Sequence, residues 1–460
     1  MWSRIGNSKL RREIANRAIR RWSSASSSVE PSSGGRFAAV WGNGDYGRLG
    51  HGNLESQWRP KPVALSGFKQ QSLKSIACGG AHTLFLTESG RVYATGLNDH
   101  GQLGISDDKM YTTEPVEVCG LPEEIVEISA GYHHSCAITV DGELYMWGNN
   151  SSGQLGLGKK SAKVVPVPTK VECLTGMFVK RAALGSEHSI AITDEGDALS
   201  WGDGGSGRLG HGHESSIFGF LGSSSEYTPR LIKKLEGLKV KNIAAGLLHS
   251  ACIDENGSVF LFGEKALQKL GFGGDKNATT PSMIDELPYS EEVACGGYHT
   301  CVITCGGELY TWGSNENGCL GNGYKRLIKI NMQHETSSLF QCYSQCSYWD
   351  DFELVMVRST DVFHLPERVE GPFVKSPVSK VSCGWKHTAA ISDGKVFTWG
   401  WGGSHGTFSE DGHSSGGQLG HGDDVDYIKP AMVYFAEPVK AVLVSCGFNH
   451  TGAIFEFAEA

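Results

Sequence analysis

The chain has 460 residues, 62 of which are glycine, and a formal net charge of −9 at pH 7. No apolar run reaches the roughly 18 residues that a membrane-spanning helix needs, so we do not expect membrane insertion. The acidic balance argues against tight, sequence-independent binding of nucleic acid, because such binding depends on neutralising phosphates with basic side chains. Glycine stands well above its usual share of about 7% and is spread along the chain with tryptophan and leucine, which indicates many tight turns.

The first segment, residues 1–35, differs in composition from the rest. It holds six arginines, one lysine and nine serines against two glutamates. The full chain carries −9 and this segment carries +5, so the remaining residues carry −14. An arginine-rich, serine-rich and acid-poor start is typical of an organelle transit peptide, and the arginine content favours the mitochondrion over the plastid. The alternative is a disordered basic tail.

A turn motif then recurs along the chain. In its first six copies, the tryptophan, threonine or phenylalanine at the start lies eight residues before the leucine of a Leu-Gly pair, and in the last copy it lies 20 before. The copies are "WGNGDYGRLGHG" (41–52), "TGLNDHGQLGIS" (95–106), "WGNNSSGQLGLG" (147–158), "WGDGGSGRLGHG" (201–212), "FGEKALQKLGFG" (262–273), "WGSNENGCLGNG" (312–323) and an expanded copy (399–422).

A second motif alternates with the first and consists of a small residue, glycine, two variable residues, histidine and then serine or threonine. Each of its first six histidines precedes the next turn motif by 12 or 13 residues. The seven histidines are His82, His134, His188, His249, His299, His387 and His450.

Short runs between the two motifs place an apolar residue at every second position and are broken by Asp-Gly, Glu-Gly, Asn-Gly or Gly-Gly. This pattern predicts a β-hairpin. Each period of about 50 residues supplies about four short strands, which is one blade of a propeller. The chain ends on half a repeat and begins, after residue 35, on the other half. We therefore predict an all-β, seven-bladed propeller over residues 37–456, closed by pairing N- and C-terminal strands in one blade.

The paired motifs resemble those of the regulator of chromosome condensation repeat family. Three functions follow from this resemblance as expectations. The first, guanine nucleotide exchange on a small GTPase, uses an inserted wedge that no stretch of this sequence matches. The second, ultraviolet-B sensing, needs repeated tryptophans, whereas only one of the equivalent positions here is tryptophan. Those positions are Gly80, Tyr132, Ser186, Leu247, Gly297, Trp385 and Phe448.

The third expectation comes from the plant mitochondrial members, which the leader and the bare propeller resemble most. The resemblance implies a non-enzymatic protein-interaction scaffold in mitochondria. That scaffold would support organellar RNA processing, including intron splicing of transcripts for respiratory complex I, and so complex I accumulation. Protein partners would bind directly and RNA would be reached through them. A guanine nucleotide exchange factor for an organellar or other small GTPase remains the alternative.

The first turn motif also matches the phosphate-binding pattern G-x-G-x-x-G through Gly42, Gly44 and Gly47. A dinucleotide-binding loop leads into a helix, but the residues that follow here have turn and strand character with prolines. Asparagine replaces the middle glycine in other copies, at Asn98 and Asn150 among them. Because glycine and asparagine both tolerate positive φ, we expect a left-handed residue here and no cofactor.

The remaining candidate residues also have structural explanations. Seven histidines on a ring diverge, so we expect neutral imidazoles that bridge backbone groups within or between blades, with no metal. We expect the cysteines that follow the repeat to be small buried hydrophobes. No nucleophile elbow, phosphate-binding loop or paired catalytic carboxylates stand out, so no catalytic residue is predicted. The cysteines in question are Cys78, Cys136, Cys295, Cys301, Cys383 and Cys446.

Two segments break the repeat. The expanded turn adds 12 residues, and its insertion at 401–414 is predicted to project from one face as a partner-binding loop through Trp401, His405, Phe408 and His413; a disordered polar loop is the alternative. The segment 325–360 lacks the turn residues found elsewhere. It is either a partner-binding insertion or a translated intron or gene-model error.

Overall fold

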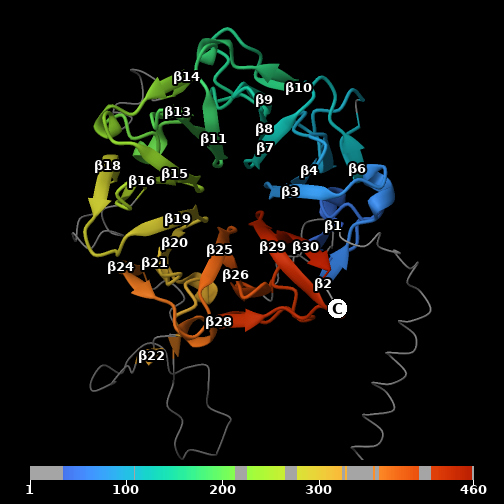
Figure 1. Ribbon diagram of the computed structural model, residues 1–460, viewed down its shortest axis with the longest axis vertical. Coiled ribbons are helices and arrows are strands. Elements are labelled where there is room, and N and C mark those ends of the chain that lie inside the picture. Colours follow the sequence, from blue (N-terminus) through green and yellow to red (C-terminus); the bar gives the residue numbers. More distant parts are fainter. Residues whose placement is uncertain are drawn as a thin grey trace, which may run out of the picture.

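Seven four-stranded antiparallel sheets form a closed ring around a central channel (Figure 1). The computed structural model describes residues 35–107, 109–212, 225–264, 277–323, 327–328, 356–357, 362–403 and 416–457. In each sheet, one edge strand lies towards the middle of the ring and the other edge strand lies towards the rim (Figure 1). The predicted seven-bladed propeller is therefore confirmed.

The blades are numbered from the first complete sheet, and their strands are given from the channel outwards. They are blade 1, β3 (Leu73–Cys78), β4 (His82–Thr87), β5 (Val92–Leu97) and β6 (Tyr111–Glu117); blade 2, β7 (Ile125–Ala130), β8 (His134–Thr139), β9 (Leu144–Asn149) and β10 (Val164–Lys170); blade 3, β11 (Val179–Leu184), β12 (His188–Thr193), β13 (Ala198–Gly202) and β14 (Glu226–Leu231); blade 4, β15 (Val240–Ala245), β16 (His249–Asp254), β17 (Val259–Gly263) and β18 (Ala278–Ile284); blade 5, β19 (Ser290–Cys295), β20 (His299–Thr304), β21 (Leu309–Ser314) and β24 (Val362–Arg368); blade 6, β25 (Val378–Cys383), β26 (His387–Ser392), β27 (Lys395–Gly400) and β28 (Tyr427–Met432); and blade 7, β29 (Val439–Cys446), β30 (His450–Phe457), β1 (Arg36–Gly42) and β2 (Gln57–Pro62).

A separate two-stranded pair and short 3-10 helices complete the described elements. They are β22 (Leu327–Ile328), β23 (Met356–Val357), η1 (Asp45–Gly47), η2 (Leu65–Phe68), η3 (Glu172–Leu174), η4 (Gly205–Gly207), η5 (Lys233–Leu235), η6 (Glu316–Gly318) and η7 (Gly371–Val374). Apart from β22 and β23, the segment 325–360 lies outside the described residues, as does the leader up to residue 34.

The hairpin that links the two sequence motifs occurs in each blade. In blade 2, His134 pairs with Gly148 and Ser135 pairs with Trp147 across β8 and β9. The turn between these strands closes at Gly142, which has a φ of +76°, a conformation open to glycine at little cost. The second strand is buried along its whole length in blades 1 to 6, because neighbouring blades cover both of its faces. The predicted hairpins are confirmed.

Blade 7 closes the ring by joining the two ends of the described chain. Strand β1 lies between β30 and β2 and runs antiparallel to both, with Arg36 opposite Glu456 and Gly42 opposite His450. The guanidinium of Arg36 also contacts the carboxylate of Glu456 at 2.6 Å. This pairing leaves no sheet edge between the first and last repeats, as the half-repeats predicted.

The first turn motif differs from our expectation at its middle glycine. Gly44 has a φ of −92° and Asn315, at the equivalent position, a φ of −102°, so a left-handed residue is not what this position requires. Its asparagines instead accept a backbone N–H through Oδ1, as Asn98 does from Leu103 at 3.1 Å. Glycine fits there because a Cβ on Gly44 would lie 2.3 Å from the carbonyl oxygen of Glu55.

The hydrophobic core is divided among the interfaces between neighbouring blades. Five tryptophans from the turn motifs are fully buried in these interfaces, and the indole N–H of three of them donates to a carbonyl of the preceding blade. Trp147 donates to Gln102 at 2.9 Å, and Trp201 donates to Gln154 at 2.8 Å. Each blade is thus held by its neighbours, so the ring forms one continuous structure.

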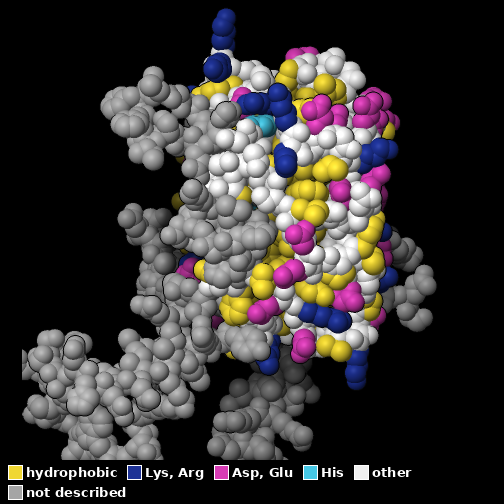
Figure 2. Space-filling view, turned by 90° about the vertical axis from the view of Figure 1, so that its left-hand side faces the viewer, with side chains coloured by type: hydrophobic (Ala, Val, Ile, Leu, Met, Phe, Trp, Pro, Cys, Tyr) yellow, Lys and Arg dark blue, Asp and Glu magenta, His cyan; other side chains and the backbone are white. Residues whose placement is uncertain are grey.

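The outer surface is mixed in character. Seen from the side of blades 3 to 5, acidic and basic side chains lie interspersed with hydrophobic ones wherever grey atoms do not cover them (Figure 2). On this view there is no single-sign field of the kind that attracts a phosphate backbone. None of the helices in the described ranges is long and apolar enough to cross a membrane.

Candidate functional site: the channel and its mouth

The seven repeat histidines form a closed ring of contacts between blades. Each begins the second strand of its blade, is at most 1% exposed, and places Nε2 between 2.8 and 3.2 Å from a hydroxyl of the next blade. The pairs are His82–Ser135, His134–Ser189, His188–Ser250, His249–Thr300, His299–Thr388, His387–Thr451 and His450–Thr83.

The direction of these hydrogen bonds follows from the hydroxyl. Ser135 donates its only proton to the carbonyl of Gln102 at 2.8 Å, so its oxygen must accept from Nε2–H of His82. Burial lowers the pKa of His82 to about 3, which keeps the imidazole neutral at physiological pH. The expected bridging role is therefore corrected in one respect: histidine binds a hydroxyl of the neighbouring blade, and that hydroxyl binds the backbone. The sequence does contain a signal for this contact, because a serine or threonine follows each repeat histidine.

The channel is narrow and lined by the first motif of each repeat. Its volume is about 110 Å³, and each blade contributes three consecutive residues to its wall. The middle residue is always glycine because a Cβ there would collide with its neighbours: on Gly185 it would lie 2.2 Å from Cε1 of His188 and 2.6 Å from the carbonyl oxygen of Gly246. The next backbone N–H then bonds to the adjacent blade, as Tyr132 does to Gly185 at 3.1 Å.

One end of this channel, which we call the mouth, carries an aromatic cluster. Its residues follow the channel glycine in each repeat, so the fold places all seven side by side, but only three are aromatic. Trp385 stacks on Phe448 with ring centroids 4.3 Å apart, and Tyr132 meets Phe448 edge-on at 5.2 Å. All three are half-buried, so part of each ring faces solvent. The cluster joins residues of blades 6, 7 and 2. Blade 1 lies between blades 7 and 2, and its mouth residue, Gly80, has no side chain to separate the rings.

Trp401 extends this cluster but does not project from it. Its side chain is 6% exposed and lies edge-on to Trp385 with centroids 5.9 Å apart. The expectation of a projecting Trp401 is therefore wrong. The backbone N–H of Trp401 donates to the backbone carbonyl of Lys386 at 2.9 Å, and this bond anchors the base of the loop. The other predicted loop residues, His405, Phe408 and His413, lie outside the described residues.

Polar side chains surround the cluster in pairs that join successive blades. Lys386 contacts Glu316 at 2.6 Å and lies 4.5 Å from the ring centre of Trp385, a cation–π arrangement. The equivalent positions of blades 1 and 2 hold Asp99 and His133, 3.8 Å apart. The repeat geometry thus brings a turn residue of one blade next to the residue before the repeat histidine of the next blade.

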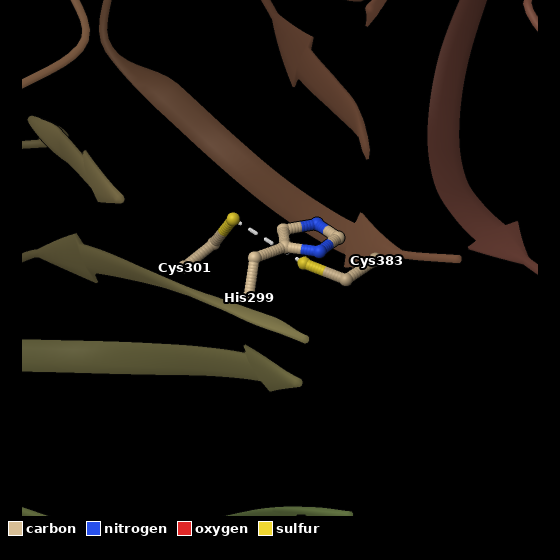
Figure 3. Close-up of side chains that lie close together, drawn as sticks. All are labelled: His299, Cys301 and Cys383. Atoms are coloured by element: carbon tan, nitrogen blue, oxygen red, sulfur yellow. Dashed lines mark hydrogen bonds between the residues drawn. The ribbon is translucent and has the colours of Figure 1, made fainter. Parts of the chain in front are cut away.

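A second group of polar side chains lies beneath the surface. His299, Cys301 and Cys383 place their nitrogen and sulfur atoms within 4.8 Å of one another where blades 5 and 6 meet (Figure 3). Nε2 of His299 is occupied by Thr388, and the thiol of Cys383 donates towards the sulfur of Cys301 at 3.2 Å. Burial raises the pKa of Cys383 well above its usual value, so this thiol stays protonated. Cys383 therefore packs here as a neutral thiol in contact with Cys301.

The cysteines that follow the repeat are buried, as predicted. Burial raises the pKa of Cys78 to about 12, which removes thiolate character and reactivity. Four of them line successive blades of the channel wall; these are Cys295, Cys383, Cys446 and Cys78.

The face opposite the mouth has a larger hollow of about 480 Å³ that is lined by residues of blades 3, 4, 5 and 6. Its charged side chains are already paired, since Lys380 contacts Glu292 at 2.8 Å and Arg181 donates to Asn242 at 3.0 Å. This hollow lacks the exposed aromatic rings that distinguish the mouth.

Comparison with known proteins agrees with this architecture. The sequence model of the RCC1-like domain matches residues 37–453. The ultraviolet-B receptor UVR8 of Arabidopsis thaliana is 31% identical over 405 residues, which cover 87% of this chain and 78% of the receptor. The mitochondrial RCC1 domain-containing protein RUG3 of Arabidopsis thaliana is 35% identical over 292 residues, 61% of this chain and 62% of RUG3.

Among solved structures, Prp20p of Saccharomyces cerevisiae superposes with a TM-score of 0.72 at 22% identity, covering 94% of this chain and 93% of Prp20p. At that identity the likeness concerns the fold alone. The family match over nearly the whole propeller is decisive: this chain belongs to the RCC1-like domain family.

Proposed function

We propose that this protein is a non-enzymatic scaffold that binds a protein partner at the mouth of its channel. The observation that carries the proposal is the half-buried cluster of Tyr132, Trp385 and Phe448. Equivalent positions in other blades hold glycine, serine or leucine, so the fold does not require aromatic rings there. Partly exposed aromatic side chains on a rigid frame are the residues that most often dominate protein–protein binding.

We further propose that the partners act in mitochondrial RNA processing, including intron splicing of complex I transcripts. The basic, serine-rich leader over residues 1–35 and the likeness to RUG3, a mitochondrial relative, support this location. The acidic balance of the propeller supports contact with RNA through partners. Light sensing is not part of the proposal, because only Trp385 of the seven mouth positions is tryptophan.

Two experiments test the location and the process. A fusion of residues 1–35 to a fluorescent reporter should enter mitochondria, and a nuclear signal would contradict the proposed location. Loss of the protein should leave unspliced mitochondrial introns and reduce complex I. Normal splicing together with normal complex I would reject the proposed process.

A second candidate function is guanine nucleotide exchange on a small GTPase. Prp20p, which shares the fold, is described by its binding to Gsp1p and histones. Nucleotide release from mitochondrial GTPases separates the two functions. Acceleration by substoichiometric amounts of this protein would favour exchange, and unchanged release would favour the scaffold.

A further inference from the structure

Three metal-ligating side chains meet at the junction of blades 1 and 2, on the mouth side. Asp99 and His100 lie in the turn between β5 and β6, and His133 lies in the turn before β8. Nδ1 of His100 is 2.9 Å and Nδ1 of His133 is 3.8 Å from Oδ1 of Asp99. All three ligand atoms lie within 4.8 Å of one another. None of these residues belongs to the repeat histidines, so the ring of hydrogen bonds does not use them.

These distances suit a first-row transition metal. With bonds of about 2.0–2.1 Å from zinc to nitrogen and oxygen, tetrahedral ligand atoms stand roughly 3.3 Å apart. The two observed separations lie on either side of that value. Two imidazoles and one carboxylate are borderline ligands that favour zinc and its neighbours over magnesium or calcium, which take oxygen ligands.

One neighbouring amide contacts two of the three candidate ligand atoms. The amide nitrogen of Gln102 donates to Oδ1 of Asp99 at 2.9 Å and lies 3.5 Å from Nδ1 of His133, so this amide turns away from Nδ1 when a metal binds there. Nδ1 of His100 is shielded from solvent and has no hydrogen bond of good geometry among the described residues.

We propose that Asp99, His100 and His133 bind one zinc-type divalent ion with a fourth coordination position open at the mouth. The side chains are 30%, 33% and 24% exposed, so water or a side chain of a partner can reach that position. Three protein ligands with one open position are the arrangement of reactive or bridging zinc sites, whereas purely structural sites are closed by four.

Other junctions show what the same positions do without metal ligands. Glu316 and Lys386 make an ion pair there between blades 5 and 6, and Ser152 contacts Glu187 at 3.4 Å between blades 2 and 3. These natural alternatives supply variants that the fold already accepts. His133→Lys copies the position of Lys386 and keeps a partner for Asp99. Asp99→Ser with His100→Ser copies Ser151 and Ser152.

Cobalt titration of the full chain, stripped with a chelator, tests the site. We expect one tightly bound Co²⁺ with the visible absorption of a tetrahedral nitrogen and oxygen site, without a thiolate charge-transfer band, and displacement by Zn²⁺. Both variants should bind at least tenfold more weakly while keeping the melting temperature of the parent within a few degrees. Equal binding by parent and variants, or a thiolate band on the parent's tight site, would overturn the proposal.

A variant that gains a metal site provides a test that does not depend on the loss of metal binding. Ser151→Asp with Ser152→His and Glu187→His transfers the three ligands to the next junction. A second equivalent of Co²⁺ with the same spectrum is the expected result. A variant that folds, as judged by its melting temperature, and still binds only one equivalent would show that these positions do not form a metal site.

Discussion

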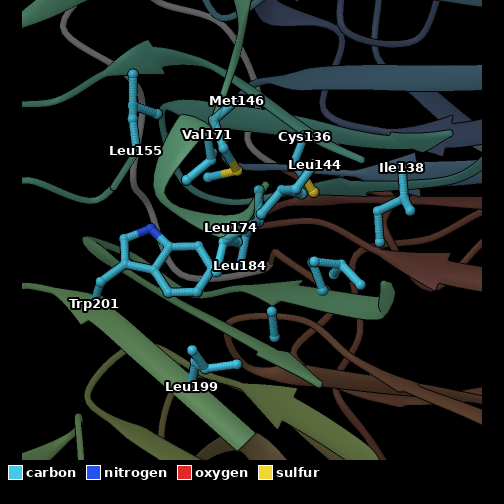
Figure 4. Packing of buried hydrophobic residues seen from close by; sticks show 13 residues of the cluster. Cys136, Ile138, Leu144, Met146, Leu155, Val171, Leu174, Leu184, Leu199 and Trp201 are labelled. Atoms are coloured by element: carbon cyan, nitrogen blue, oxygen red, sulfur yellow. The ribbon is translucent and has the colours of Figure 1, made fainter. Parts of the chain in front are cut away.

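The interfaces between blades and the mouth of the channel are built from the same repeats but follow opposite rules. At the junction of blades 2 and 3, Trp201, Leu144 and Leu184 pack in a buried cluster that other junctions reproduce with similar residues (Figure 4). At the mouth, the residue type at equivalent positions varies, from a glycine at Gly80 to a tryptophan at Trp385. The repeat motif therefore shows what holds the ring together, and we propose that departures from it at the mouth mark the partner-binding surface.

The largest effect should come from a tryptophan of the blade interface. Trp201→Ala removes a fully buried indole and its hydrogen bond to Gln154, and should lower the free energy of unfolding by about 3–5 kcal/mol. Trp385→Ala, the matched change at the mouth, should cost about 1 kcal/mol because that ring is only half-buried. Denaturant unfolding measures both. Equal losses would erase the distinction between the two regions.

Acidification should weaken the interfaces through the repeat histidines. Burial lowers the pKa of His82, His134 and His387 to about 3, whereas the unfolded chain takes up these protons near pH 6.5. Above about pH 6.5 these histidines are neutral in both states and do not lower the free energy of unfolding. As the pH drops from 6.5 towards 3, each histidine lowers the free energy of unfolding by up to about 1.4 kcal/mol per pH unit. Unfolding at pH 7.5, 6.5, 5.5 and 4.5 tests this, and a flat profile from 7.5 to 4.5 would contradict it.

Two histidines adjacent in sequence give a sharper contrast. His134→Ala leaves the buried hydroxyl of Ser189 without its donor and should cost about 1–3 kcal/mol. His133→Ala, one residue earlier at the mouth, should change stability by less than about 0.5 kcal/mol in chelator-treated protein. Melting temperatures and denaturant midpoints of the two variants provide the comparison. A larger loss in the His133 variant would reverse our assignment of roles.

Phe448→Ser should separate a small effect on stability from a large effect on binding. Phe448 contacts Tyr132 and Trp385 without filling the interface core, so the unfolding midpoint should shift by no more than about 1 kcal/mol. Partner binding should nevertheless fall at least tenfold, as expected for a ring at the centre of a binding surface. A variant that binds as well as the parent would remove Phe448 from the proposed site.

The sequence was most informative where the repeat is strict. Spacing between His134 and Trp147 predicted the hairpin, and the two half-repeats predicted how β1 joins β30. The hydroxyl partner of each histidine was missed because it lies in the next blade, over 50 residues away along the chain in six of the seven cases and across the ring closure in the seventh. Repeat spacing fixes order around the ring but does not show which side chains meet across a junction.

The mouth was harder to predict for the same reason. Tyr132 and Phe448 lie more than 300 residues apart in sequence and meet because the ring closes over the glycine at position 80. Trp401 carried a misleading signal, because a tryptophan at the start of an insertion is also what anchors the base of a loop. Asp99, His100 and His133 occupy variable positions of the two motifs, so the motifs do not predict their residue types, and their proximity emerges only from the three-dimensional arrangement.

Affinity capture from mitochondria most directly tests the claim that the mouth binds a protein partner. The full chain should be compared with a variant carrying Trp385→Ala and Phe448→Ala, and with Phe178→Ala, an exposed aromatic residue away from the mouth as the control. We predict that the same partners are recovered by the parent and the Phe178 variant and are lost from the mouth variant. Undiminished recovery by a folded mouth variant would contradict the account.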